Sequence, residues 1–244
     1  MEFMVRLALI KLRGYREWTE SLGFDREWRI QATQSRIFSI LSVEAASVDA
    51  LAVPFRHDMH LVVASNVPEY RLRYLVSRLS LHSPVPVEYS IGCGPTPRDA
   101  IDAAFFSRGC NGAGGGPEAV LLAHVDLDDI TGFADKHGLY EAYLVVAELY
   151  SRLVEELREY GCIVSYLGGD NILVLLSPET DAILALEDLV EEYNAKAGIG
   201  YGATGRIAAR EATRCLDEIR AGRRASRVAV CASGAVPDWL AALS

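Results

Sequence analysis

The feature that most constrains the fold of this chain is an internal duplication. Three segments recur in the same order and at a nearly constant offset. The pairs are LALIKL at 7–12 with LAHVDL at 122–127, RHDMHLVV at 56–63 with GGDNILVL at 168–175, and EYSIGCG at 88–94 with KAGIGYG at 196–202. Self-similarity of this kind indicates two copies of one structural module. A length of 244 residues leaves room for two such domains.

A glycine-rich stretch separates the two copies. The residues from 107 to 117 read SRGCNGAGGGP, which holds neither a helix nor a strand. We therefore expect a first domain over 1–108, a linker over 109–117 and a second domain over 118–244.

The second copy shows the order of elements most clearly. An apolar run at 120–127 is typical of a central strand, and 140–160 predicts an amphipathic helix with Tyr143, Val146, Leu149, Leu153 and Leu157 on one side. Further strands are expected at 163–167, 172–176, 197–201 and 228–231, and further helices at 182–194 and 207–220. The order predicts the α+β class: two tandem ferredoxin-like βαββαβ domains, each an antiparallel sheet with helices on one face.

Composition excludes several classes of protein. Apolar residues make up 50% of the chain, which is enough for a core, and the net charge is −9. A broad grip on nucleic acid needs excess positive charge, so we expect no nucleic-acid partner. No apolar run approaches the length that spans a membrane, and the N-terminus lacks the layout of a secretory signal, so we expect a cytoplasmic protein without a membrane partner.

The cysteines give no sign of a metal site. The five are odd in number and widely spaced, and none forms a C-x-x-C pair. We expect no zinc, and we expect reduced, buried thiols.

Two aspartates should meet at one edge of the second sheet. In the ferredoxin-like order the third strand lies beside the first, so the end of the first strand neighbours the turn that precedes the third. Asp126 lies at that strand end and Asp170 on that turn. Two adjacent carboxylates repel each other unless a cation lies between them, and Mg²⁺ prefers oxygen ligands. We expect Asp126, Asp170 and the backbone carbonyl of Leu127 to bind Mg²⁺, with two or more ions in the complete site.

Each part of this pattern also has a structural explanation. Asp126, Asp128 and Asp129 could cap the following helix, and Gly168-Gly169-Asp170-Asn171 is a good hairpin turn in any protein. The metal prediction depends on their combination at the spacing that this fold requires. His124 is typical of a satisfied core histidine, and no Ser-His-Asp set is visible.

The motifs resemble a known family. HVDLDD at 124–129 with GGDN at 168–171 is similar to class III nucleotide cyclases and GGDEF-type enzymes. A closer resemblance is to archaeal GTP cyclohydrolase III. It rests on YREWT at 15–19, IQATQSR at 30–36, HVDLDDITG at 124–132, GGDN at 168–171 and KAGIG at 196–200.

The resemblance implies a Mg²⁺-dependent, zinc-free hydrolase with GTP as its small-molecule substrate. Such an enzyme opens the imidazole ring and releases two orthophosphates. The product is a formamidopyrimidine ribonucleotide monophosphate (2-amino-5-formylamino-6-ribosylamino-pyrimidinone 5′-monophosphate), on the route to flavins. The resemblance also implies a homo-oligomer, a dimer or a tetramer.

The resemblance and the positions of the residues together suggest the site. Asp126 and Asp170 are the expected catalytic residues. The expected substrate contacts are Gln31, Gln34, Arg36, Arg56, Leu127, Asp128, Asp129, Ile130, Thr131, Gly168, Gly169, Asn171, Arg220 and Arg223. Arg220, Arg223 and the neighbouring Arg224 would meet phosphate, although cations at a helix C-terminus are favourable without any ligand.

The first copy departs from the pattern. Lys11 and Arg13 stand where the second copy has Asp126 and Asp128, and only Asp58 remains acidic. We therefore expect an asymmetric pair, with metal on the second copy and cationic or base-recognising groups on the first. Two other functions stay open: a two-metal nucleotidyl cyclase or transferase, and a catalytically inactive GTP-binding sensor.

Overall fold

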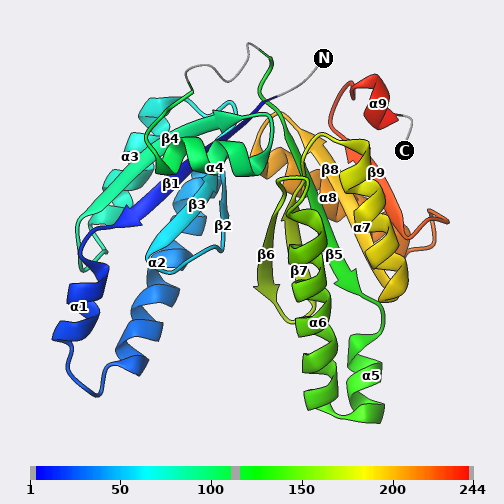
Figure 1. Ribbon diagram of the computed structural model, residues 1–244, viewed down its shortest axis with the longest axis horizontal. Helices are drawn as coiled ribbons and strands as arrows, with labels where there is room; N and C mark the ends of the chain where they lie inside the picture. The colour runs from blue at the N-terminus through cyan, green and yellow to red at the C-terminus, as the bar shows by residue number, and fades with distance from the viewer. Residues whose placement is uncertain (1–3, 111–115, 242–244) are drawn as a thin grey trace.

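The computed structural model describes residues 4–110 and 116–241. The first copy contains β1 (Val5–Leu12), α1 (Tyr15–Ser21), α2 (Glu27–Ser47), β2 (Leu51–Val53), β3 (Met59–Val63), α3 (Glu69–Ser80), β4 (Val87–Gly94) and α4 (Pro97–Phe105). The second contains β5 (Val120–Leu127), α5 (Ile130–His137), α6 (Leu139–Leu157), β6 (Ile163–Gly168), β7 (Asn171–Leu175), α7 (Thr180–Glu192), β8 (Ala195–Gly202), α8 (Gly205–Arg220), β9 (Val228–Ala232) and α9 (Asp238–Ala241). The two copies form two lobes (Figure 1).

The strand order confirms the predicted fold class. One sheet has the order β2-β3-β1-β4 and the other β6-β7-β5-β8-β9. The pairs within each set of four are antiparallel, as in the ferredoxin-like plan, and β9 adds a parallel strand at the edge of the second sheet. Of the expected linker, residues 111–115 lie outside the described residues. No helix in the described part of the chain is long and apolar enough to cross a membrane.

The helices of each copy lie on both faces of its sheet, so the expectation of helices on one face was wrong. In the second copy α6 and α7 cover the face that carries Ala123 and Val125, and α8 packs on the face that carries Leu122. In the first copy α2 and α3 pack on the face that carries Ile10, and α4 lies on the other. The two faces that carry α4 and α8 share one apolar core, in which Leu7 and Val63 of the first copy meet Leu122 and Leu173 of the second.

A glycine motif explains how α4 and α8 come so close to their strands. A Cβ added at Gly200 would lie 1.9 Å from the carbonyl oxygen of Ala208, and one at Gly92 would lie 2.2 Å from that of Ala100. Only glycine permits such a close approach of a helix backbone. The recurring Ile-Gly-x-Gly segment is therefore a packing signature of this fold.

The expectation of reduced thiols was wrong for four of the five cysteines. Cys93 of β4 forms a disulfide with Cys110, and Cys215 of α8 forms one with Cys231 of β9. Sequence spacing could not show these pairs, because they depend on how α4 and α8 pack across their sheets. Cys162 is the free cysteine, and burial raises the pKa of its thiol.

Candidate functional site

The β5–β7 ladder brings the two aspartates to one edge of the second sheet. Val125 is paired with Ile172 in antiparallel register. Asp126, the next residue of β5, therefore lies across from Asn171 and one residue from Asp170, which opens the hairpin into β7. The Asn171 amide donates a hydrogen bond to the Asp170 carboxylate at 3.2 Å.

Asp126 is buried against a cation. Its side chain points to the α8 side of the sheet and is 8% exposed. Arg220, in the last turn of α8, contacts both carboxylate oxygens, with Nη2 at 2.6 Å and Nε at 3.3 Å. The hydrogen bonds that Arg220 donates to Asp126 raise the pKa of its guanidinium. A buried carboxylate without this partner would carry a large desolvation penalty.

Asp128 extends the charged edge. It contacts Lys196 of β8 at 2.5 Å and Arg227 at 2.7 Å. Burial opposes ionisation of this carboxyl, but the hydrogen bonds from these two cations outweigh it and lower the pKa of Asp128. Three cationic side chains therefore lie at the end of β5, and each is paired with Asp126 or Asp128.

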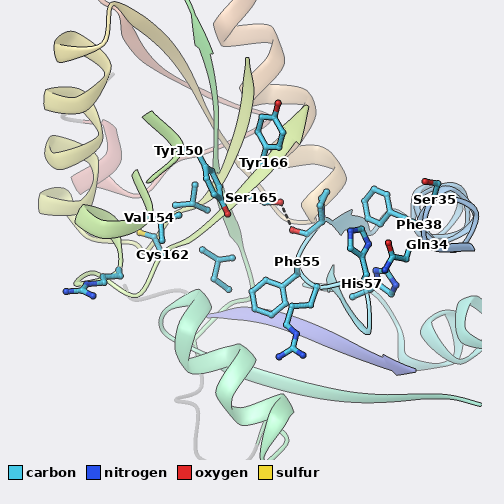
Figure 2. Close-up of a pocket in the computed structure, with 16 residues that line it drawn as sticks. Gln34, Ser35, Phe38, Phe55, His57, Tyr150, Val154, Cys162, Ser165 and Tyr166 are labelled. Atoms are coloured by element: carbon cyan, nitrogen blue, oxygen red, sulfur yellow. Dashed lines mark hydrogen bonds between the residues drawn. The ribbon is translucent and has the colours of Figure 1, made fainter. Parts of the chain in front are cut away.

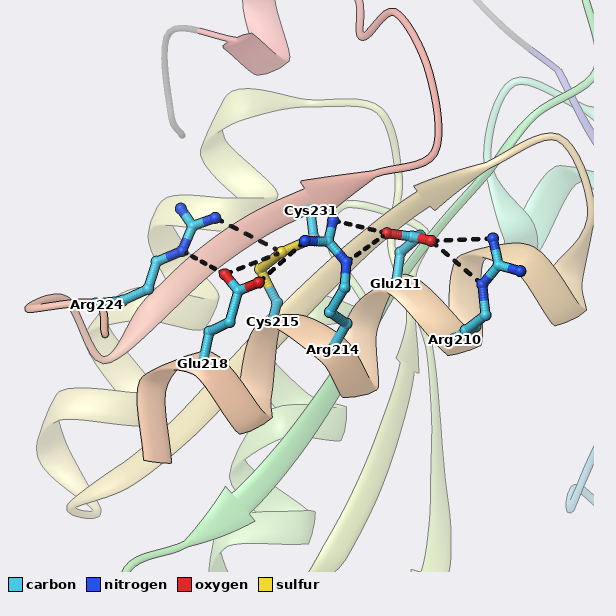
Figure 3. A network of polar contacts seen from close by, with 7 residues as sticks. All are labelled: Arg210, Glu211, Arg214, Cys215, Glu218, Arg224 and Cys231. Carbon is cyan, nitrogen blue, oxygen red and sulfur yellow. Dashed lines mark hydrogen bonds and ion pairs between the residues drawn. A yellow bond between two sulfur atoms is a disulfide. The ribbon is translucent and has the colours of Figure 1, made fainter. Parts of the chain in front are cut away.

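A network along α8 supports the position of Arg220 (Figure 3). The Thr204 hydroxyl caps the helix by accepting from the Ile207 amide. Glu211 is only 5% exposed, and hydrogen bonds from Arg214 and Arg210 lower its pKa against the opposing effect of burial. The Cys215–Cys231 disulfide then ties α8 to β9. The helix that carries Arg220 is thus held at several points.

The hairpin between β6 and β7 needs a left-handed backbone at two positions, and glycine occupies both. Gly168 and Gly169 have φ values of 111° and 63°, in the left-handed region that favours glycine. The Tyr166 hydroxyl donates to the carbonyl of Gly169 at 2.9 Å. The Nε2 atom of His124 lies 2.9 Å from the side-chain oxygen of Asn171, so the histidine ring is hydrogen-bonded beside the hairpin.

An open groove of about 1080 Å³ borders this hairpin. It is lined by α5 and α6 and by Tyr166, Gly169 and Asp170. Tyr143 was expected on the buried side of its helix, but it is 62% exposed and lines the groove together with Tyr140. The groove therefore has aromatic walls, and its charged lining residues are Asp135 and Asp170.

The donor set suits a hard divalent cation. Carboxylate oxygens of Asp126 and Asp170 and the carbonyl of Leu127 are the ligands that Mg²⁺ prefers. Among the described residues, no group of three or more His, Cys, Asp and Glu side chains could hold a metal. A divalent ion here would therefore share Asp126 with Arg220 and would complete its coordination with water or phosphate oxygens.

The other expected site residues fall into two groups. Leu127 ends β5, Asp129 precedes α5 with a left-handed φ of 49°, and Ile130 and Thr131 line the groove. Gln31 and Arg36 lie exposed on α2, and Arg223 is exposed beyond α8.

Gln34 and Arg56 line a separate cavity between the two copies. The side-chain amide of Gln34 donates a hydrogen bond to the Tyr15 hydroxyl at 2.6 Å.

Sequence reasoning missed several residues of the edge. Lys196 and Arg227 bind Asp128, and the tyrosines of α6 line the groove. Lys196 could have been found, because antiparallel pairing of β5 with β8 sets it opposite Asp126. Arg227 follows an irregular segment after α8, which no periodicity places.

The chain is similar in sequence to proteins of one family. The family model for GTP cyclohydrolase III matches residues 4–233. A Pyrobaculum arsenaticum protein named GTP cyclohydrolase III is 40% identical over 219 residues, covering 89% of this chain and 96% of that protein. An Aeropyrum pernix protein of the same name is 34% identical over 227 residues, covering 88% and 92%. The GGDEF domain of DgcB from Caulobacter crescentus, solved in complex with c-di-GMP, has a TM-score of 0.38 at 18% identity, over 47% of this chain and 77% of that one.

The chain thus folds as a tandem pair of ferredoxin-like domains with a charged edge on the second. It belongs to the GTP cyclohydrolase III family. Membership confirms the resemblance found in the sequence and makes the chain an enzyme of the hydrolase type.

Proposed function

We propose that the chain is a Mg²⁺-dependent GTP cyclohydrolase that works at the Asp126–Asp170 edge. The observation that carries the proposal is the match of residues 4–233 to the GTP cyclohydrolase III family. The reaction consumes three waters: one opens the imidazole ring at C8, and two cleave the phosphoanhydride bonds to give two orthophosphates. The remaining product is a formamidopyrimidine ribonucleotide monophosphate.

The groove beside the hairpin would hold the guanine base. Tyr140, Tyr143 and Tyr166 offer aromatic faces for stacking, and Thr131 and Asp135 offer polar groups for the base edge. A base in this groove directs its ribose and triphosphate toward Asp170.

The charged edge would hold the triphosphate. Asp126, Asp170 and the Leu127 carbonyl would bind Mg²⁺, which when bound neutralises phosphate charge and favours attack by water. Arg220 would exchange part of its contact with Asp126 for a phosphate oxygen. Lys196 and Arg227 would keep their ion pairs with Asp128, close to Arg220, and would raise the electrostatic potential near the phosphates. Cytoplasmic location and assembly as a homo-oligomer belong to the same proposal.

Product analysis tests the proposal. The purified chain is incubated with GTP and Mg²⁺, and the guanine absorbance, orthophosphate and pyrophosphate are followed together. A cyclohydrolase loses the guanine absorbance and releases two orthophosphates per GTP. Release of pyrophosphate with the purine intact would instead indicate a cyclase or transferase, and tight GTP binding without turnover would indicate a sensor.

The contribution of the first copy has its own test. Arg36→Gln and Arg56→Gln remove charges that we expected to contact GTP. If the first copy contacts the substrate, each variant raises the dissociation constant for GTP while the circular dichroism spectrum is unchanged. An unchanged affinity in both variants would confine the substrate to the second copy.

A further inference from the structure

A second cavity, of about 610 Å³, lies between the two copies (Figure 2). One wall comes from α2 and the loop between β2 and β3, and the other from α6 and β6. The candidate catalytic groove lies on the other side of Tyr166, which lines both spaces.

The cavity lies beside an edge strand that differs between the copies. β6 has 6 residues, whereas its counterpart β2 has only 3. The chain after β2 leaves the sheet and crosses toward the second copy. There the Ser165 hydroxyl donates to the carbonyl of Pro54 at 2.5 Å. This hydrogen bond joins the two copies at the wall of the cavity. The cavity therefore belongs to the interface between the copies.

Aromatic rings from both copies face this space. Phe38 and Phe55 belong to the first copy and Tyr150 and Tyr166 to the second. Phe55 is 46% exposed and Tyr166 is 45% exposed, so neither of these two lining rings is buried by the protein itself. Rings at opposite walls of a cavity of this size are suited to stacking on a flat ligand.

One polar group in the wall is buried without a partner among the residues that the structure describes. His60 is 1% exposed and lines the cavity, and its Nε2 atom makes no hydrogen bond with any of them. Burial, helped by the charge of His57, lowers the pKa of His60 to about 4, so the ring is neutral at physiological pH. A buried ring nitrogen without a partner is costly, and a ligand hydrogen bond would remove that cost. The second copy has the apolar Ile172 at the corresponding position.

We propose that this cavity is a second ligand site that binds a purine nucleobase, carried by a nucleoside or nucleotide. The base stacks between rings of the two copies, and its polar edge meets His60, Gln34 and Ser35. The two nearby arginines are already paired, Arg56 with Asp58 and Arg158 with Glu159. The base, rather than a phosphate, therefore supplies the binding energy.

The site is linked to the catalytic hairpin through Tyr166. The ring of Tyr166 lines the cavity, and its hydroxyl holds the carbonyl of Gly169. A ligand that packs on Tyr166 therefore acts on the hairpin that carries Asp170. The inference stands without the proposed reaction, because binding is measured without turnover.

Calorimetric titration of the full chain with guanosine and with guanosine 5′-monophosphate, in excess chelator, tests the proposal. We expect one ligand per chain and affinities for the two probes within about threefold of each other, because the paired arginines offer little to a phosphate. Phe55→Ala and His60→Ile should each weaken binding by about tenfold or more, as loss of a stacking ring or of a buried hydrogen bond predicts. Tyr74→Ala removes a comparably exposed ring elsewhere, on α3, and should change nothing.

Tyr143→Ala separates this site from the catalytic one, because Tyr143 lines the catalytic groove but not the cavity. Binding of guanosine should survive this substitution, and GTP turnover in Phe55→Ala should remain while its response to added guanosine disappears. Absence of binding at millimolar guanosine would overturn the proposal. Equal binding by wild type and both cavity variants, or loss of binding in Tyr143→Ala, would overturn it as well.

Discussion

The two copies share a fold but carry opposite chemistry at the same edge. In the second copy Asp126 lies opposite the hairpin that carries Asp170, and it is held by Arg220 from α8. In the first, Lys11 takes the place of Asp126 and lies over the ring of Phe105 at 4.7 Å. Asp58 remains, but Arg56 contacts both of its oxygens at 2.9 and 2.8 Å.

This difference shows how a duplicated domain can divide its roles. The first copy has one remaining carboxylate, Asp58, and a neighbouring arginine pairs with it. The second keeps two carboxylates, of which Asp126 is paired with an arginine from a distant helix, and Asp170 adds a second set of oxygen ligands to the metal site proposed above. The first copy instead contributes the short strand and the buried histidine of the cavity between the domains.

The largest expected effect separates the two edges by activity. Asp126→Asn and Asp170→Asn should each lower kcat for GTP by about a thousandfold, as loss of a ligand to a catalytic metal predicts. Asp58→Asn, the matched change in the first copy, should leave kcat within about twofold, because an exposed ion pair contributes little. Steady-state kinetics with orthophosphate detection measures all three. Equal losses in all three variants would mean that both edges take part.

A second prediction concerns packing. Gly198 of the second copy corresponds to Ser90 of the first, and a Cβ at Gly198 would lie 2.1 Å from the carbonyl oxygen of Ala212. The first copy tolerates a side chain because α4 ends at Phe105, before it reaches the equivalent place. Gly198→Ser should therefore lower the free energy of unfolding by about 2–4 kcal/mol, as overpacking beneath a helix predicts.

Urea unfolding measures this effect, with Ser90→Gly as the matched control. The control should shift the free energy of unfolding by less than about 1 kcal/mol, because it removes only a small, half-buried side chain. A similar loss in both variants would show that helix length does not explain the difference between the copies.

Much of the fold could be predicted from the sequence, because the duplication fixed the order of elements twice. The strand at 120–127 matches β5, and the ends of α8 and β6 fall close to expectation. The face occupied by α4 and α8 could not be predicted, since both faces of the sheet are apolar. It became clear only from the shared core and from the glycines beneath these helices.

The relative position of the two aspartates was predicted from the sequence. Asp126 lies beside the Asp170 hairpin because the first and third strands of the copy are neighbours, and the strand order is enough to predict this. The partners of these aspartates could not be predicted, because Arg220 and Arg227 reach them from segments far along the chain. Disulfides were missed for the same reason.

A third prediction uses the histidine that distinguishes the copies. The folded chain resists protonation of His60, whose pKa is lowered to about 4, whereas the unfolded chain takes up this proton near the ordinary pKa of 6.5. Stability from this group is present above pH 6.5 and is lost as the pH falls toward 4, by about 3 kcal/mol. His60→Ile, which restores the residue type of the second copy, should remove this part of the pH dependence. Unfolding curves at pH 4.5 and 7 check it, and an unchanged slope would contradict the buried neutral ring.

The smallest expected effect compares the two ion pairs. Arg56→Gln should lower the free energy of unfolding by less than about 1 kcal/mol, because both partners of that pair are partly exposed. Arg220→Gln should cost about 1–3 kcal/mol without divalent cations, because Asp126 is then left buried and unpaired. Added Mg²⁺ should recover part of the loss in Arg220→Gln only. If both variants lost the same free energy of unfolding, with or without Mg²⁺, the two ion pairs would not differ as we expect.

The most direct measurement is the binding of a divalent cation to the full chain, followed with Mn²⁺ by electron paramagnetic resonance and displaced with Mg²⁺. In the presence of GTP we predict saturable binding that disappears in Asp126→Asn and in Asp170→Asn and is unchanged in Asp58→Asn. Binding that persists in both second-copy variants, or that depends on Asp58, would contradict a metal site on the second copy alone.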